Sequence, residues 1–170
     1  MEHVDTQSWA LADYNFGENV TDWCSLVLVK VMRGRERVGY VFVIDRRMGE
    51  KARYKLPGGH NTAGETPFGT AMRETLGEAG VTVTNLKLVD KWKHTNSKTP
   101  HWKCLFVGEL SESRSMSLNS QNEENEGEES EFFTIGEFQN LVREKKFLGD
   151  HYDELVYTKL IEPIPEVATA

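Results

Sequence analysis

The sequence predicts an α+β fold in which helices cover a β-sheet, and three kinds of segment support this prediction. Two nearly continuous apolar runs, rich in β-branched residues, are typical of central strands. Two later runs also have strand character, and one of them alternates apolar and polar residues. Three segments carry the start and stop signals of helices. The 170 residues show no break in composition, so we expect a single domain over residues 1–170.

The predicted strands come in two pairs, each joined by a polar connection. In chain order they are Trp23–Met32, Gly39–Asp45, Val81–His94 and His101–Leu110. In the last strand Trp102, Cys104 and Phe106 fall on one face. Cys24 and Cys104 lie inside apolar runs, and no histidines stand beside them at ligand spacing. We therefore expect two buried thiols and neither a disulfide nor a zinc site.

The first predicted helix runs from Thr66 to Ala79. Thr66 is suited to cap it, Pro67 fits the first helical position, and Gly80 supplies the stop. At about 100° per residue, one stripe is expected to face the core. That stripe consists of Phe68, Met72, Thr75, Leu76 and Ala79. Glu74 and Glu78 then lie on nearly the opposite side of the helix.

Two further helices are predicted near the end of the chain, where they would cover the sheet. Thr134 and Glu137 have the spacing of a capping box, which predicts a helix through Glu144. Asp150 is expected to cap the last helix, and Pro163 to stop it.

Glu74 and Glu78 are separated by one helical turn, and this placement gains nothing locally. Like charges at this spacing cost about 0.2–0.5 kcal/mol, and Glu78 lies at the end where the helix dipole disfavours an anion. For two glutamates alone, a solvated helix face is the simplest interpretation. The alternative is a divalent cation, which would turn the repulsion into attraction. Upstream, Pro57 and the pair Gly58-Gly59 predict a bend that exposes main-chain carbonyls.

The spacing of the whole stretch favours the second interpretation. It closely resembles the pattern of the Nudix hydrolase family, G-x5-E-x7-R-E-U-x-E-E-x-G-U, in which U is aliphatic. The matching residues are Gly59, Glu65, Arg73, Glu74, Glu78, Gly80 and Val81. The resemblance implies an α/β/α sandwich with a mixed central sheet flanked by helices. It also implies cleavage of a nucleoside diphosphate linked to another group, with Mg²⁺ or Mn²⁺ as cofactor.

The same resemblance assigns roles to individual residues. Glu74, Glu78 and the carbonyl of Gly59 would hold the metal, while Arg73 would pair with Glu65 and fix the loop against the helix. Many family members place one more glutamate shortly before a strand that leads into a helix, as a metal ligand or general base. Glu126 matches that offset best, although Glu128 and Glu129 lie close to it. Water activation is left open between Glu78 and Glu126.

Two positions depart from the family pattern. Thr75 replaces an aliphatic residue, and its methyl group can still pack. Gly77 replaces the first glutamate of the E-E pair, which removes a potential metal ligand and costs about 1 kcal/mol of helix propensity relative to alanine. A slower enzyme, or one with fewer metals, is the reading we prefer. The alternative is a Nudix-like module that binds a nucleotide without cleaving it and acts as a sensor or adaptor.

The acidic excess is concentrated in one segment. Between Arg114 and Arg143 there are seven glutamates and no lysine or arginine, and the net charge of the chain is −7. The rest is balanced, so we expect no binding to duplex nucleic acid. Residues 111–130 are rich in Ser, Asn and Glu, which predicts a flexible acidic loop. A second alternative function is therefore an interaction protein that uses the segment Glu123–Glu131.

Basic residues lie between the second strand and the glycine bend. Arg46, Arg47 and Arg53 are candidate ligands of substrate phosphates, because the guanidinium fork suits them; ordinary solvated charge is the alternative.

No apolar run is long enough to span a membrane, and the first residues lack the features of a secretory signal, so we expect a cytoplasmic protein. The specific substrate is left open, and so is the oligomeric state, for which a homodimer is one option.

Overall fold

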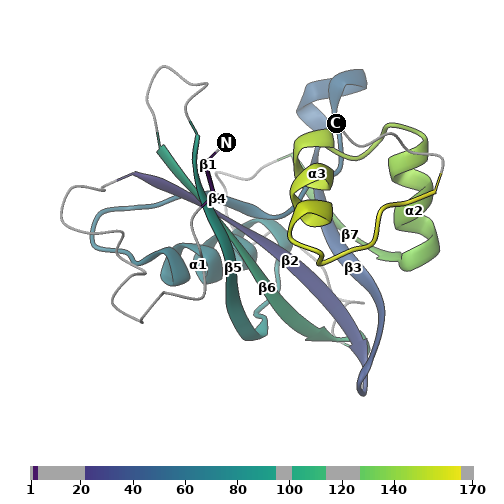
Figure 1. Ribbon diagram of the computed structural model, residues 1–170, viewed down its shortest axis with the longest axis horizontal. Helices are drawn as coiled ribbons and strands as arrows, with labels where there is room; N and C mark the ends of the chain where they lie inside the picture. Colours follow the sequence, from purple (N-terminus) through teal and green to yellow (C-terminus); the bar gives the residue numbers. More distant parts are fainter. Residues whose placement is uncertain (1, 4–21, 95–100, 114–126, 166–170) are drawn as a thin grey trace.

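A computed structural model describes residues 2–3, 22–94, 101–113 and 127–165, which form a mixed β-sheet with helices on both faces (Figure 1). The elements are β1 (Glu2–His3), β2 (Trp23–Arg33), β3 (Glu36–Asp45), the 3₁₀ segment η3 (Arg46–Lys51), β4 (Gly58–His60), α1 (Pro67–Ala79), β5 (Thr84–His94), β6 (His101–Ser111), β7 (Glu128–Thr134), α2 (Ile135–Arg143) and α3 (Gly149–Tyr157). The predicted α+β sandwich with a mixed central sheet is confirmed.

The described residues contribute seven strands, in the order β1-β5-β6-β2-β3-β7, with β4 paired to β2. Strands β2 and β6 are parallel, whereas the other neighbours are antiparallel. Strands β2 and β3 pair only from Val29 and Val41 toward their connecting turn. Before that point β2 pairs with β4, and Lys55 forms a bridge with Val43 of β3. The chain around residues 55–60 therefore fills the gap where β2 and β3 diverge.

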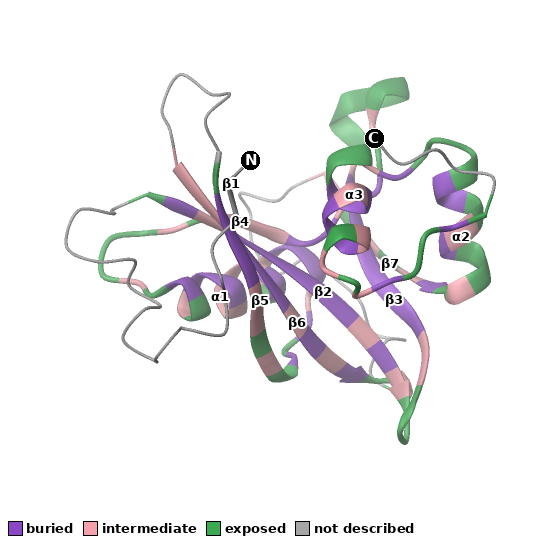
Figure 2. Ribbon diagram, in the orientation of Figure 1, coloured by how far each residue is buried: buried purple, intermediate pink, exposed green. Residues whose placement is uncertain are grey.

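Each face of the sheet carries its own core, and the central strands are buried on both sides (Figure 2). On one face, Val27, Val43 and Phe106 pack with Ala71 and Ala79 of α1. On the other, the core is formed with α2 and α3. Its members include Leu26, Leu28, Phe42, Leu105, Phe138, Leu141, Tyr152 and Leu155. Helix α1 thus lies on the opposite side of the sheet from α2 and α3 (Figure 1).

The predicted core stripe of α1 was partly wrong. Phe68 and Leu76 are 42% and 43% exposed, whereas Thr75 and Ala79 are buried as expected. The buried residues of the helix are Pro67, Thr70, Ala71, Thr75, Glu78 and Ala79. Most of these side chains are small, so the helix approaches the sheet on a narrow face. The large apolar side chains are displaced to the edge of that contact.

Two other predictions about element ends need correction. The N-cap of α3 is Leu148, which makes no side-chain capping bond, and Asp150 lies in the first turn instead. The acidic segment does not continue as a loop to residue 130, because Glu128 already belongs to β7. Residues 114–126, which include most of the predicted flexible loop, lie outside the described residues. The capping box of Thr134 and Glu137 is present at α2.

The remaining sequence predictions concern the thiols and the membrane. Cys24 and Cys104 are both free, and Cys104 is buried while Cys24 is half-buried. Trp102, Cys104 and Phe106 share the face that packs toward α1, as their alternation predicted. Within the described residues, no helix has the length and apolar character needed to cross a membrane.

The burial pattern predicts a contrast between two phenylalanines. Phe42 is fully buried, so we expect Phe42→Ala to lower the free energy of unfolding by about 3–5 kcal/mol. Phe68→Ala removes the same atoms from a 42% exposed position, and its effect should stay below about 1 kcal/mol. Urea unfolding measures both values. Equal losses of unfolding free energy in the two variants would show that Phe68 is buried, as the apolar residues of α1 predict.

Candidate active site

The bend before α1 is built into the sheet. The amide of Val27 donates to the carbonyl of Pro57 at 2.9 Å, and Gly58 and Gly59 pair with Leu26 and Ser25 of β2. A Cβ atom on Gly59 would lie 2.6 Å from Cδ of Glu74, so only glycine allows this carboxylate to pack against the backbone. The second glycine of the bend therefore sets the position of the Glu74 side chain.

Helix α1 is fixed at both ends and along its length. Thr66 caps the first turn by accepting from the amide of Gly69 at 3.1 Å, and Gly80 ends the helix in the left-handed conformation at φ 72°. Trp23 and Ser25 of β2 bind the helix from the side of the sheet. The Trp23 indole donates to the Thr70 hydroxyl at 3.1 Å, and the Ser25 hydroxyl donates to the carbonyl of Pro67 at 2.8 Å. The carboxylates of α1 are thus held at a fixed distance from the sheet.

Arg73 clamps the loop onto the helix. Its Nε and Nη2 atoms donate to the two carboxylate oxygens of Glu65 at 2.7 and 3.1 Å, Nη2 also donates to the carbonyl of His60, and Nη1 donates to Glu74 at 2.6 Å. Glu65 accepts further bonds from the amide of Thr62 and the hydroxyl of Thr70. These bonds, above all that from Arg73, lower the pKa of Glu65 to about 2. The pairing expected between Arg73 and Glu65 is observed.

Glu78 does not lie on a solvated face, which corrects the expectation that it stands opposite the core. It is 3% exposed, and its Oε1 accepts from the amide of Gly58 at 3.1 Å. Its carboxyl group faces that of Glu128 on β7, within hydrogen-bonding reach. Burial, followed by the hydrogen bond and charge of Glu128, raises the pKa of Glu78 to about 9.

One oxygen of each acid in this pair has no donor. The Oε2 atoms of Glu78 and Glu128 are both buried without a hydrogen-bond partner among the described residues. Two ionised carboxylates in this arrangement repel each other, so a shared proton or a cation is needed between them. No three His, Cys, Asp or Glu side chains of the described residues form a preformed metal cluster. Mg²⁺ is typically held by one or two carboxylates and completes its shell with water and substrate phosphates, so the pair fits this ion.

The strand alternation of β7 explains why Glu128 faces the helix. Glu128, Ser130 and Phe132 share one face: the Ser130 hydroxyl donates to the carbonyl of Ala79, and Phe132 packs into the core beside α1. Sequence reasoning favoured Glu126, which lies outside the described residues. Extending the E-F-F-T strand upstream by its period of two would have singled out Glu128.

The comparison with known proteins identifies the family. A family model described as the NUDIX domain matches residues 25–155. The chain belongs to the Nudix family. No functionally curated protein matched the sequence.

Solved Nudix structures share the fold at low sequence identity. The NUDIX domain of Shewanella oneidensis NrtR, complexed with ADP ribose, superposes with a TM-score of 0.62 at 9% identity, covering 91% of this chain and 93% of that one. A mutT/nudix family protein from Listeria innocua gives 0.59 at 13% identity, with coverages of 84% and 94%. A NUDIX hydrolase from Nitrosomonas europaea gives 0.58 at 16% identity, with coverages of 82% and 88%. These likenesses concern the fold alone.

The arginines expected to meet substrate form ion pairs or main-chain hydrogen bonds in this Nudix domain, and their role toward substrate stays a prediction. Arg46 pairs with Glu129 at 2.9 Å, and Arg47 forms two bonds with Asp45 at 2.9 and 3.0 Å. Arg53 donates to main-chain carbonyls beside η3. The half-buried Lys55 was not singled out from its neighbours by the sequence. Its positive charge acts on both Glu78 and Asp45.

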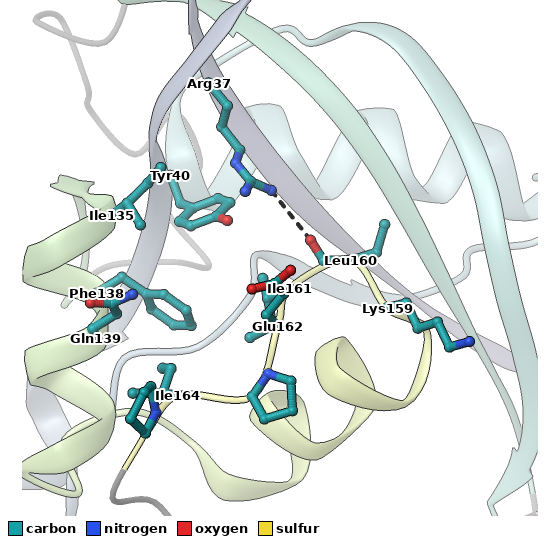
Figure 3. A pocket seen from close by; sticks show the side chains of 12 residues that line it. Arg37, Tyr40, Ile135, Phe138, Gln139, Lys159, Leu160, Ile161, Glu162 and Ile164 are labelled. Atoms are coloured by element: carbon teal, nitrogen blue, oxygen red, sulfur yellow. Dashed lines mark hydrogen bonds between the residues drawn. The ribbon is translucent and has the colours of Figure 1, made fainter.

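A separate cavity of about 650 Å³ lies between α2 and the segment that follows α3 (Figure 3). Tyr40, Phe138 and Ile164 contribute apolar surface to it, while Arg37 crosses its rim and donates to the carbonyl of Leu160 at 3.3 Å. None of the acidic residues of the Nudix pattern lines this cavity. The cavity is therefore separate from the carboxylates that form the candidate active site.

The depressed pKa of Glu65 predicts an acid-sensitive fold. Because its folded pKa of about 2 lies below the ordinary value of 4.5, its contribution to stability is present above pH 4.5 and is lost as the pH falls toward 2. We expect Glu65→Gln to flatten the decline of unfolding free energy across this window, measured by urea unfolding at stepwise pH. Glu36→Gln, at an exposed position, is the control and should leave the decline unchanged.

Proposed function

We propose that this protein is a Nudix hydrolase that cleaves the pyrophosphate linkage of a nucleoside diphosphate joined to another group, with Mg²⁺ or Mn²⁺ as cofactor. The observation that supports this most directly is the pair of donorless buried oxygens on Glu78 and Glu128. Glu78 accepts from the amide of Gly58, the next residue Gly59 packs against Glu74, and Arg73 holds this loop through the carbonyl of His60. A nucleoside diphosphate derivative is a natural choice of substrate class, because the solved relatives include an ADP-ribose complex and an Ap4A hydrolase.

The residues have distinct tasks in this proposal. A divalent cation would supply positive charge to the non-bridging phosphate oxygens and acidify a bound water. Glu78, Glu128, Glu74 and the Gly59 carbonyl are the groups placed to hold it. Lys55, whose charge reaches this site, is the candidate for neutralising a substrate phosphate.

The chemistry is a hydrolysis in which water adds to one phosphorus and the bridging P–O bond breaks. The water proton passes to a carboxylate, for which Glu78 and Glu128 are the candidates, and the products are a nucleoside monophosphate and the phosphorylated partner group. Arg73 and Glu65 act as positioning residues, because they keep the loop and the helix in register before substrate arrives.

The first test is a screen of nucleotide sugars, dinucleotides and modified nucleoside triphosphates with Mg²⁺ or Mn²⁺, with release of monophosphate as readout. Gly77 favours a second candidate, a Nudix module that binds a nucleotide without cleaving it. Calorimetric binding in the same screen separates the two, because the second candidate binds a compound and releases nothing. An interaction role for the segment Glu123–Glu131 predicts instead that replacing Glu123 and Glu124, which precede β7, with glutamine weakens partner capture while hydrolysis persists.

Replacing either acid of the buried pair should disable the site. We expect Glu78→Gln and Glu128→Gln each to lower kcat by about 10²-fold or more, and to weaken Mn²⁺ binding followed by electron paramagnetic resonance. Glu129→Gln is the matched control, because Glu129 is the next residue of β7 and points to the other face, where it pairs with Arg46. If Glu129→Gln is as damaging as Glu128→Gln, the assignment of Glu128 is wrong.

Restoring the family residue at position 77 tests how much its loss matters. We expect Gly77→Glu to raise kcat about tenfold, because it returns a carboxylate to the turn between Glu74 and Glu78. Gly77→Ala is the control, since it improves helix propensity by about 1 kcal/mol without adding a charge. Steady-state kinetics with Mn²⁺ compares the two. An equal gain from alanine would assign the effect to helix stability.

A further inference from the structure

Four side chains form a row across one end of the sheet, on the face that α2 and α3 cover. Trp92 of β5 pairs with Lys103 of β6, Lys103 pairs with Cys24 of β2, and Cys24 pairs with His60 of β4. Paired residues on neighbouring strands point to the same face of a sheet. The face is identified by Leu26 of β2, two residues after Cys24, which packs in the core with α3.

His101 belongs to the same surface. It precedes Lys103 by two residues on β6, so its side chain lies on the same face. Its ring contacts that of His60, with centroids 5.3 Å apart and an angle of 62° between the planes. Lys103, His60 and His101 therefore bring one ammonium group and two imidazoles together, and we call them the Lys103 patch.

Among the residues that the structure describes, no acidic side chain forms an ion pair with the cation of this patch. Lys103 is half-buried, and within the described residues its side chain makes no hydrogen bond or ion pair. A partly desolvated ammonium group without a partner is costly, and an anionic ligand would offset that cost. The patch thus has the donors and the charge that a phosphate group requires.

The patch lies beside the carboxylate site. His60 follows Gly59 directly, and its carbonyl accepts from Arg73 at 2.9 Å. Cys24 lies between the two in the sheet, because it pairs with Lys103 of β6 on one side and with His60 of β4 on the other. A phosphate chain held at Glu78 and Glu74 would reach the patch across β4.

We propose that the Lys103 patch binds a phosphate of the substrate beyond the two that flank the cleaved bond. This inference rests on the proposed hydrolase function and narrows its substrate class. Substrates with three or more phosphates in a chain, such as dinucleoside polyphosphates, are then favoured over those with two. The same patch would be left empty by a simple nucleoside diphosphate derivative.

The test compares dinucleoside polyphosphates that differ only in having two, three or four phosphates. The wild type should show a kcat/KM about tenfold or more higher for the longer compounds. Lys103→Met should remove this preference by raising KM for the longer compounds, with little change for the two-phosphate compound, and Lys103→Arg should restore much of it. Lys93→Met is the matched control, because Lys93 is exposed and pairs with Trp102, which faces the other side of the sheet.

Several results would overturn the inference. The first is that the wild type prefers the two-phosphate compound. The second is that Lys103→Met slows the hydrolysis of all three compounds equally, or of none. The third is that Lys93→Met loses the preference for longer compounds as Lys103→Met does. If no compound is hydrolysed, the proposed function fails, and calorimetry with inorganic tripolyphosphate still tests the patch. Wild type and Lys93→Met should then bind it about tenfold more tightly than Lys103→Met. Equal binding by all three would refute the patch alone.

Discussion

The burial of the Glu78 carboxyl group against that of the half-buried Glu128 is the constraint on which the site depends. Water cannot solvate Glu78, and the only donor to its side chain among the described residues is the amide of Gly58. Ionising Glu78 would place a charge in a poorly screened interior beside the carboxyl group of Glu128, so burial, followed by that neighbour, raises the pKa of Glu78 to about 9. Glu78 and Glu128 would hold a divalent cation, which would supply the positive charge that this pair of acids lacks. Under the proposed function, binding of such an ion would stabilise this region of the fold.

Features written in consecutive residues could be predicted from the sequence. Thr66, Pro67 and Gly80 delimit α1 because capping and the left-handed stop are local interactions, and the structure reproduces those limits. The same holds for the capping box of Thr134 and Glu137 at α2. The family spacing identified the loop and the helix for a related reason. Both belong to one continuous stretch of the chain, so the number of residues between two positions limits how far apart they lie.

Features that depend on distant partners could not be predicted in this way. Strand β2 determines which face of α1 is buried, because its Trp23 and Ser25 bind the helix through Thr70 and a backbone carbonyl. The sequence of the helix alone therefore placed Phe68 in the core, although it is largely exposed. Glu128 acquires its position from the pairing of β7 with β3, in which it lies opposite Asp45. Composition assigned the residues around it to a loop, because a glutamate-rich edge strand has few apolar residues to reveal its alternation.

The acidic ligands among the described residues have a consequence for how this Nudix site would bind its reactants. Position 77 is glycine, and Glu74 is the further acid of α1 beside Glu78 and Glu128, with one of its oxygens already accepting from Arg73. An ion such as Mg²⁺ held by these described residues would take several of its oxygen ligands from water or from substrate phosphate. Under the proposed function, metal and substrate would then bind with positive coupling, each increasing the affinity for the other by the same factor. A hydrolase and a nucleotide sensor built on this site would share that coupling and would differ only in whether a carboxylate accepts the proton of the attacking water.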